Sequence, residues 1–290
     1  MYLQLYCKMS HQSCEQNFIG FPPGLLGDTP LRIPIIREAE DWIAMEKPVG
    51  VGVRKHPWDI CVPDMDTALN SQLKTNKPEL LKHNATLLGS IYYLEPEISG
   101  VSVFAKNREG LVRLRNLVGS EGVQFRFLFV AKAGIVSART RELIADEPLL
   151  IHNTKPKMIP STAKGKKTLT SFRLLFESDL GWALWEACTN YIRPHQVRAH
   201  AATHKFPIMG DEIYSGPKAP LLSDSLPQKR RSEVFCSVFN GIALHLYKVI
   251  LPSLDSTSDV IHLFAKLPKH FRLMLQRIQL LDAAKAAIPL

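Results

Sequence analysis

The sequence predicts an α+β domain built on a mixed sheet. Short strand-like segments alternate with only a few helical ones, and they lack the regular strand–helix–strand period of a doubly wound fold. Of the 290 residues, 46% are hydrophobic and 22% are charged. This is an ordinary globular composition, and a chain of this length has enough apolar side chains for a substantial core.

The first 32 residues carry turn signals rather than strand or helix patterns. Residues 21–24 (F-P-P-G) and 27–30 (G-D-T-P) combine residue types that are typical of turns and loops. The N-terminal extension over residues 1–32 is therefore expected to be largely irregular, and regular structure is expected to begin near Ile33.

The remaining elements follow from the spacing of apolar residues. Strand-like segments are expected at residues 42–46, 100–105, 125–130 and 168–176, with either a strand or a sharp turn at 47–53. Residues 67–73 are expected to form a helix, with Thr67 as its N-cap and with Leu69 and Leu73 on one face. A second helix is expected over residues 111–118, where leucines recur with helical spacing.

The charge balance favours a polyanionic partner. Lysine and arginine number 36 against 27 acidic residues, which gives a net charge of +9 and an isoelectric point of about 9.3. Residues 150–167 and 228–231 contain runs of basic residues, which indicate exposed cationic loops. RNA and DNA phosphates are the commonest partners of such a surface, although many proteins are modestly basic without a specific partner.

The cysteines and the hydropathy pattern bear on location. The five cysteines are odd in number, widely scattered and free of any C-x-x-C pair: Cys7, Cys14, Cys61, Cys188 and Cys236. This pattern gives no support to a zinc ribbon or a thioredoxin-type site, and it is typical of free thiols in a reducing compartment. No segment approaches the ~18 uninterrupted apolar residues of a membrane span, and no signal-peptide core is present. We expect a cytoplasmic protein without membrane contact.

A cluster of arginines and histidines occupies residues 193–200 (R-P-H-Q-V-R-A-H), and residues 206–214 follow as F-P-I-M-G-D-E-I-Y. The residue types predict a strand end that leads into a helix, and spacing alone would give this helix a charged, solvated face. His195 and His200 do not form the H-E-x-x-H pattern, and no carboxylate is placed to complete a zinc site. We therefore expect no metal.

This stretch resembles a signature of the RluA-like RNA pseudouridine synthases, T/S-G-R-T-H-Q-I-R-x-H followed by G-H-P-I-x-G-D-x-x-Y. The matching residues keep the order and spacing of that signature: Arg193, His195, Gln196, Arg198, His200, Pro207, Ile208, Gly210, Asp211 and Tyr214. Shorter matches occur around Lys47, Thr170, His245 and Phe271, so that the resemblance extends from about residue 33 to about residue 276.

The resemblance implies a pseudouridine synthase fold, in which a mixed, mostly antiparallel sheet with flanking helices carries a central RNA-binding cleft. It implies one synthase-like catalytic domain over residues 33–280, with no separate S4-type RNA-binding domain before it. It further implies an isomerase that modifies structured RNA, ribosomal or transfer RNA, without a cofactor. We expect this domain to act as a monomer.

The loop at residues 87–100 (L-L-G-S-I-Y-Y-L-E-P-E-I-S-G) resembles the family's H-R-L-D-x-x-S/T-S/T-G signature with its catalytic residue exchanged. Tyr92, Tyr93 and Glu95 stand where the family has histidine, arginine and the catalytic aspartate. A glutamate keeps the carboxylate, whereas the tyrosine at position 93 removes a cation and offers a stacking ring instead.

Other positions depart from the family at the same time. Phe125 and Phe127 stand where the family has an active-site lysine and tyrosine, which removes a hydroxyl contact to the base. Tyr191 and Ile192 replace a small T-G pair before Arg193, and the loss of the permissive glycine should alter the local backbone. Together these departures indicate an active site that has drifted or been repurposed.

Glu95 and Arg198 are the candidate catalytic residues. Breaking and remaking the bond between base and sugar requires one ionised carboxylate, and a nearby guanidinium favours that ionised form. The extra methylene of Glu95 shifts its oxygens by roughly an ångström, and a shift of that size can lower the rate about 10²-fold. From the same resemblance we expect RNA contacts from Tyr93, Phe127, Arg193, His195, Gln196 and Lys47.

Three functions stay open on the sequence alone. The first is a pseudouridine synthase in which Glu95 replaces the aspartate, and the second is a catalytically inactive RNA-binding pseudoenzyme of the same fold. The third is a protein-interaction scaffold, against which the net charge of +9 argues. Within the site, Glu95 could be an ordinary turn residue, and Arg198 could pair structurally with Glu95 or Asp211.

Overall fold

The computed structural model describes residues 17–134, 141–222, 236–254 and 259–288. The strands of its large sheet are β1 (Phe18–Phe21), β2 (Leu31–Glu38), β3 (Trp42–Lys47), β4 (Gly89–Ser90), β5 (Ser99–Ala105), β6 (Gln124–Lys132), β7 (Glu142–Ala145), β10 (Thr170–Ser178), β11 (Trp182–Thr189), β12 (Leu244–Pro252) and β13 (Val260–Phe264). A separate two-stranded pair consists of β8 (Leu149–Ile151) and β9 (Met158–Pro160). The helices are α1 (Met65–Lys74), α2 (Pro78–Leu81), α3 (Arg108–Gly119), α4 (Gln196–Thr203), α5 (Lys269–Arg277) and α6 (Leu281–Ala287), with the 3-10 turn η1 (Glu212–Tyr214). None of these helices is long and apolar enough to cross a membrane.

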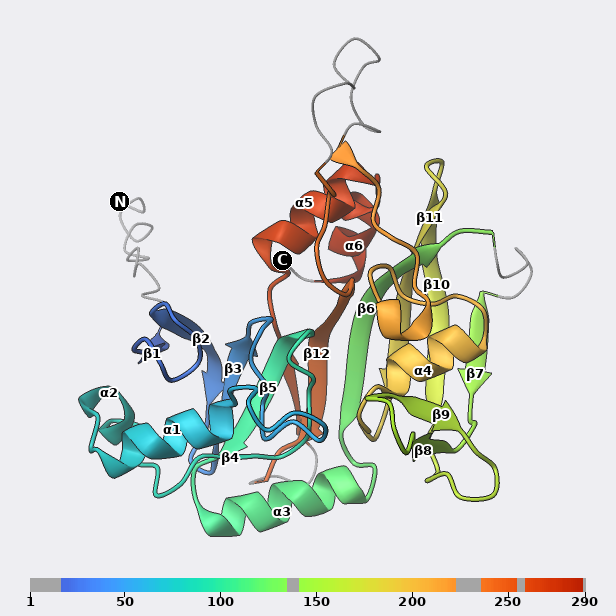
Figure 1. Ribbon diagram of the computed structural model, residues 1–290. Coiled ribbons are helices and arrows are strands. Elements are labelled where there is room, and N and C mark those ends of the chain that lie inside the picture. The colour runs from blue at the N-terminus through green and yellow to red at the C-terminus, as the bar shows by residue number, and fades with distance from the viewer. Residues whose placement is uncertain (1–16, 135–140, 223–235, 255–258, 289–290) are drawn as a thin grey trace, which may run out of the picture.

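The large sheet is mixed (Figure 1). Its strand order is β1-β2-β3-β5-β12-β6-β11-β10-β7, with β13 beside β12 and β4 beside β5. Among the described strands, β5 and β12 form the parallel pair and every other pairing is antiparallel. The predicted α+β fold with a mixed, mostly antiparallel sheet is confirmed.

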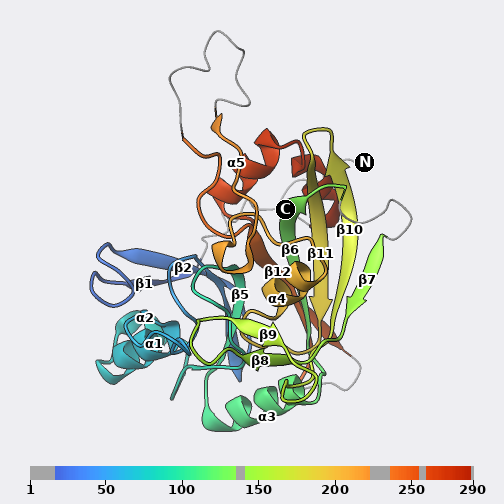
Figure 2. The ribbon, with the colours of Figure 1, turned by 45° about the vertical axis from the view of Figure 1, so that its right-hand side comes forward.

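The helices divide between the two halves of the sheet and its two ends. In both ribbon views, α4 and the β8–β9 pair lie over the half that contains β6, β11 and β10 (Figures 1 and 2). α1 and α2 lie beside the half that contains β1 to β3, α3 runs along one end, and α5 with α6 lies at the other (Figure 1). The parallel β5–β12 pair is the seam between the two halves, so the loop before β5 faces the start of α4.

An aromatic cluster fills the core behind α4. Phe129, Phe172, Trp185 and Phe206 are buried, and Trp185 stacks on Phe206 with their ring centroids 4.8 Å apart. Each such pair contributes ~0.5–1.5 kcal/mol beyond the apolar area that it buries. Because Phe206 follows α4 directly, this cluster fixes the segment that leads from α4 to Asp211.

The first predicted helix begins earlier than expected. It is α1, and its N-cap is Asp64 rather than Thr67, because the Asp64 carboxylate accepts the Thr67 backbone N–H and the Thr67 hydroxyl, both at 2.8 Å. An aspartate is favoured here because its negative charge lies at the positive end of the helix dipole. The helix buries Leu69 as predicted, together with Met65.

Part of the N-terminal extension forms a strand. Phe18–Phe21 forms β1 against β2, because Ile19 and Phe21 are apolar enough to bury themselves at the edge of the sheet. Residues 1–16 and the basic run at 228–231 lie outside the described residues. The other basic loop, 150–167, contains the β8–β9 pair as well as exposed lysines.

Candidate active site

The loop between β4 and β5 carries Glu95 and is held by its backbone carbonyls. The Lys47 ammonium donates to the carbonyls of Pro48 at 2.8 Å, Ile98 at 2.6 Å and Pro96 at 3.4 Å. Burial of this ammonium lowers the pKa of Lys47 to about 7, opposed by the nearby carboxylates of Glu95 and Glu97. Lys47, a predicted RNA contact, therefore has its charged end inside the loop, where it braces the backbone around Glu95.

Glu95 itself is buried, with 3% of its surface exposed. Its Oε1 accepts the backbone N–H of His195 at 2.5 Å, which joins the loop before β5 to the start of α4. Burial raises the pKa of Glu95, whereas the Arg198 charge and the His195 N–H act to lower it. Glu95 is thus no ordinary exposed turn residue, and its carboxylate is enclosed beside a guanidinium.

His195 has an uncommon backbone conformation that suits this contact. Its φ of 54° and ψ of 14° place it in the left-handed region immediately before α4. Its Nδ1 lies 3.2 Å from the Tyr214 hydroxyl, and its ring lies 4.8 Å from the ring of Trp58, centroid to centroid. Burial, reinforced by the Arg198 charge and His56, lowers the pKa of His195 to about 2, so its imidazole is neutral at physiological pH.

Arg198 forms a bidentate ion pair with Asp211. The Nε–Oδ2 and Nη2–Oδ1 distances are 2.7 Å and 2.8 Å, and both side chains are at most 1% exposed. The structural pairing with Asp211 that the sequence left open is therefore present. Nevertheless, Nη1 of Arg198 is buried without a hydrogen-bond partner among the described residues. Since buried donors are nearly always paired, this nitrogen is free to bind a ligand.

Glu95 and Arg198 line one small cavity between the sheet and α4. Phe127 of β6, Leu244 of β12 and Arg193 complete its wall. Its volume is about 10 Å³, roughly the space that one water needs. A nucleobase can enter this cavity only when lining side chains move.

The positions that depart from the family pattern differ in how they meet the cavity: Phe127 and Ile192 line it, whereas Tyr92, Tyr93 and Phe125 are not part of its lining. The Tyr92 hydroxyl donates to the carbonyl of Val101 at 2.8 Å, and its ring meets Phe125 edge to face at 4.8 Å. Phe127 lies against the cavity, and its contact with RNA stays a prediction. The Tyr93 hydroxyl is buried without a partner among the described residues. Tyr92 and Phe125 are packing residues, whereas Tyr93 keeps one polar atom available.

Gln196 and Arg193 brace the chain just before α4. The Gln196 side chain donates from Nε2 to Thr189 Oγ1 at 2.9 Å and accepts the Arg193 N–H at 3.1 Å. The Arg193 guanidinium donates to the carbonyl of Lys167 at 3.1 Å and lies 4.7 Å from the centre of the Tyr191 ring. Arg193 also lines a second, larger hollow. Of these two predicted RNA contacts, Arg193 is the partly exposed one and Gln196 is buried.

That larger hollow adjoins the cavity. It has a volume of about 500 Å³ and shares Thr189 and Arg193 with the cavity wall. Tyr191, Lys167 and Gly119 form other parts of its lining. Lys167 and Arg193 bring two cations to it, and Glu121 brings one carboxylate.

Some residues of the site carried no usable signal in the sequence. Trp58 comes from the loop after β3 and covers His195, yet an isolated tryptophan in a loop predicts nothing about its partner. Asp211 and Tyr214 belonged to the matched signature, but only the fold shows that they contact Arg198 and His195. Within the described residues, no three side chains of metal-ligating types gather as an ion site would require.

Comparison with known proteins finds relatives that are named as pseudouridine synthases. No family model matches the chain. The chain is 28% identical over 262 residues to ribosomal large subunit pseudouridine synthase D of Haemophilus ducreyi, covering 88% of this chain and 72% of the relative. It is 27% identical over 256 residues to the protein of the same name from Haemophilus influenzae, covering 87% and 71%.

Solved structures agree on the fold. Human RNA pseudouridylate synthase domain containing 4 superposes with a TM-score of 0.62 at 21% identity, covering 84% of this chain and 92% of that one. Human RNA pseudouridylate synthase domain containing 1 gives a TM-score of 0.55 at 16% identity, covering 81% and 84%. The fold that the sequence resemblance implied is confirmed.

Proposed function

The chain belongs to the RluA-like family of RNA pseudouridine synthases, and we propose that it isomerises uridine to pseudouridine in structured RNA. Ribosomal RNA is the first candidate, because the curated relatives are named for the large ribosomal subunit. The observation that carries the proposal is that Glu95 and Arg198 line the same cavity. Nη1 of Arg198 has no hydrogen-bond partner among the described residues, and the His195 N–H donates to the Glu95 carboxylate.

The reaction breaks the bond between N1 of uracil and C1′ of ribose and forms a bond from C5 to C1′. The hydrogen of C5 leaves and N1 gains one, so the overall change is redox-neutral. An ionised carboxylate against the sugar is the group that this chemistry needs. Glu95 supplies it, and Arg198 favours its charged form against the opposing effect of burial.

The target base must leave its stack before it reaches Glu95, which costs a few kcal/mol. The cavity is too small for the base, so the side chains at its mouth move when RNA binds. Tyr93 and Phe127 then offer flat apolar surfaces to the base, and Arg193 offers its charge to the backbone. Stacking of one base on an aromatic ring contributes about 1–3 kcal/mol, which offsets the cost of flipping.

Pseudouridine mapping in cells with and without this gene tests the proposal. A uridine that stays unmodified after deletion is expected to regain its modification with the wild-type chain but not with Glu95→Gln. Glu97→Gln is the matched control, because it makes the same change two residues further along the loop, and it is expected to restore the modification. A map that does not change on deletion, or full restoration by Glu95→Gln, would contradict the proposal.

The purified protein gives a second, quantitative test. Tritium at uridine C5 of ribosomal RNA is released when the new bond forms, so its release measures turnover. Glu95→Gln is expected to abolish the release, because the amide keeps an acceptor for the His195 N–H but supplies no ionised carboxylate to the sugar. A wild-type rate in this variant would show that Glu95 is not the reacting carboxylate.

We also infer that the protein works as a cytoplasmic monomer. The described cysteines, Cys61, Cys188 and Cys236, are free thiols, which suits a reducing compartment. Light scattering on the purified chain, alone and with RNA, is expected to give the mass of one copy. A stable dimer would contradict this part of the proposal.

A further inference from the structure

Arg54, in the loop after β3, has a buried polar atom that nothing in the function proposed above uses. Its Nε is buried without a hydrogen-bond partner among the described residues. An unpaired buried donor of a charged group lowers stability by more than ~1–3 kcal/mol, so such groups are rare unless a ligand pairs them. Arg54 therefore resembles Arg198, which has a free buried nitrogen as well.

Backbone hydrogen bonds place Arg54 beside the loop of Glu95. The N–H of Val53 donates to the carbonyl of Leu94 at 3.5 Å, and the N–H of Asp66 donates to the carbonyl of Val53 at 3.0 Å. Arg54 thus follows Val53, which is hydrogen-bonded to Leu94, the residue between Tyr93 and Glu95.

Arg115 reaches the same place from α3. Its Nε and Nη2 donate to the carbonyl of Ser90 at 3.2 Å and 2.9 Å. Ser90 in turn donates its N–H and its hydroxyl to the two carboxylate oxygens of Asp66, both at 2.8 Å. The Arg54 guanidinium lies near enough to that of Arg115 and to the Asp66 carboxylate to interact with both, and burial raises the pKa of Asp66. Asp64 is a second carboxylate close to Asp66, and its side chain caps α1.

Two tyrosines lie near the Arg54 guanidinium. The phenol groups of Tyr93 and Tyr191 are both near enough to interact electrostatically with its guanidinium. The Tyr93 hydroxyl is buried without a partner among the described residues, and Tyr191 lines the hollow of about 500 Å³. Arg54 lies where the Glu95 loop and this hollow approach each other. Gly119, one turn of α3 beyond Arg115, lines the same hollow.

We propose that Arg54 and Arg115 bind one backbone phosphate of the RNA strand that runs from the hollow to the Glu95 cavity. Guanidiniums suit this role because their planar forks donate two hydrogen bonds at once to phosphate oxygens. The Tyr93 hydroxyl supplies a further donor to the same anion. The identity of the anion rests on the proposed function, whereas the two-arginine site rests on the contacts described above.

Binding of a labelled oligouridylate at several salt concentrations tests this site. Arg54→Gln removes the charge and leaves no broken hydrogen bond at Nε, so it is expected to fold like the wild type. It should weaken binding about tenfold and lower the slope of log K against log salt by about 0.7, the value for one phosphate contact on a single strand. Arg54→Lys should keep the slope and lose only part of the affinity.

Arg115→Ala and the double variant decide whether the two arginines act on one phosphate. In the double variant the slope of log K against log salt should fall by no more than about 0.7, the value for one phosphate contact, because both residues contact the same group. Arg108→Ala is the control, since it removes one exposed arginine from the same helix outside the proposed site. Inorganic phosphate at matched ionic strength should compete weakly, because RNA presents its phosphate together with a base.

The outcomes separate this inference from the proposed function. If the slope of log K against log salt is unchanged in Arg54→Gln and the wild-type protein releases tritium, the phosphate site is overturned and the proposed synthase activity stands. Loss of slope in Arg54→Gln without any tritium release by the wild type supports the site and overturns the synthase. A slope loss that Arg108→Ala reproduces assigns the effect to general charge and overturns the site. A wild type that binds no oligouridylate overturns the site as well.

Discussion

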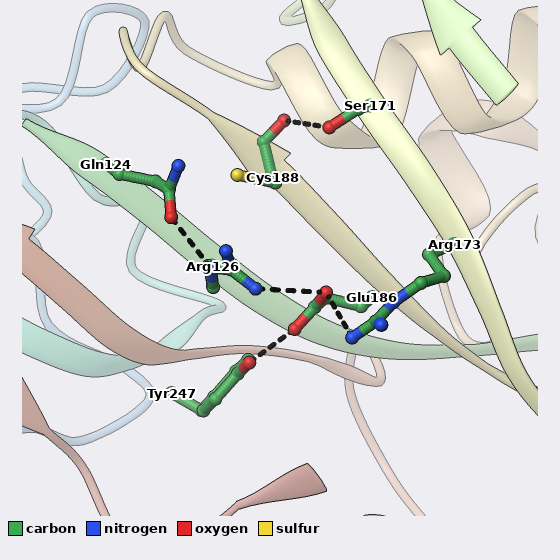
Figure 3. A network of polar contacts seen from close by, with 7 residues as sticks. All are labelled: Gln124, Arg126, Ser171, Arg173, Glu186, Cys188 and Tyr247. Atoms are coloured by element: carbon green, nitrogen blue, oxygen red, sulfur yellow. Dashed lines mark hydrogen bonds and ion pairs between the residues drawn. The ribbon is translucent and has the colours of Figure 1, made fainter. Parts of the chain in front are cut away.

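Two arginine–carboxylate clusters lie on opposite faces of strand β6, and they differ in how completely they pair their atoms. On the cavity face, Arg198 and Asp211 form one buried bidentate pair that leaves Nη1 of the arginine unpaired. On the other face, Glu186 accepts from Arg126, from Arg173 and from the Tyr247 hydroxyl (Figure 3). In the first cluster one arginine nitrogen has no hydrogen-bond partner among the described residues, whereas in the second, which we call the saturated cluster, both carboxylate oxygens accept hydrogen bonds.

The alternation of side chains along the strand separates the two clusters. Arg126 and Phe127 are neighbours in β6, so they point to opposite faces, and Phe127 lines the cavity. The arginines of the saturated cluster are partly in water, with side-chain exposures of 31% for Arg126 and 51% for Arg173, against 1% for Arg198. The cavity face therefore holds a desolvated guanidinium with one unpaired nitrogen, which suits a binding site, whereas the opposite face supports the sheet.

Removing the carboxylate from each cluster should give very different losses of stability. Asp211→Asn leaves the buried Arg198 charge without compensation, and breaking a buried pair in this way costs about 3–5 kcal/mol. Glu186→Gln keeps an acceptor for Tyr247 and lets water reach both arginines, so it should cost about 1 kcal/mol. Urea unfolding of both variants measures the difference. Equal losses of unfolding free energy would show that the two carboxylates stabilise the protein to the same extent.

The same two variants should differ in activity as well. Asp211→Asn releases Arg198 from its fixed orientation, so tritium release should fall well beyond the change in folded fraction. Glu186→Gln should turn over like the wild type, because the network does not reach the cavity. Activity lost in Glu186→Gln at full folding would mean that the two faces are coupled through β6.

The contrast also marks what the sequence predicts and what it does not. The sheet type and the meeting of Glu95 with Arg198 followed from motifs, because those motifs specify residue types at fixed spacing. The contacts of Lys47 and Gln196 did not, since an ammonium or amide looks alike in sequence whether it binds RNA or a backbone carbonyl. The role of Arg54 was likewise hidden, because its neighbours come from distant segments. Partner choice is set by tertiary contacts, which a single sequence does not display.

Glu95 adds a second buried carboxylate to the cavity face, and its titration should be visible in stability. Burial raises its pKa above the value of 4.5, so the folded state holds this proton at a higher pH than the unfolded chain does. The stabilisation of the folded state by this tighter proton binding is fully present below pH 4.5, and it is lost as the pH rises through the pKa of Glu95 in the folded state. Each unit of pKa difference corresponds to about 1.4 kcal/mol.

Glu95→Gln removes that loss, so its stability relative to the wild type should rise between pH 4.5 and neutrality. Thermal unfolding across this range measures the rise. Glu109→Gln, on the exposed surface of α3, is the control and should follow the wild-type curve. A constant difference between Glu95→Gln and the wild type across the range would mean that burial does not disfavour the carboxylate.

The smallest effect is expected from the exposed arginine of the saturated cluster. Arg173→Ala removes a partner of Glu186 at 3.0 Å, yet half of the arginine side chain is in water and Arg126 and Tyr247 remain. Such pairs contribute about 0.2–1 kcal/mol, and salt weakens them further. Urea unfolding in low and high salt should therefore show a small loss that shrinks as salt is added. A loss above about 2 kcal/mol that salt does not change would place Glu186 in the same desolvated class as Asp211, and the distinction between the two faces of β6 would then fail.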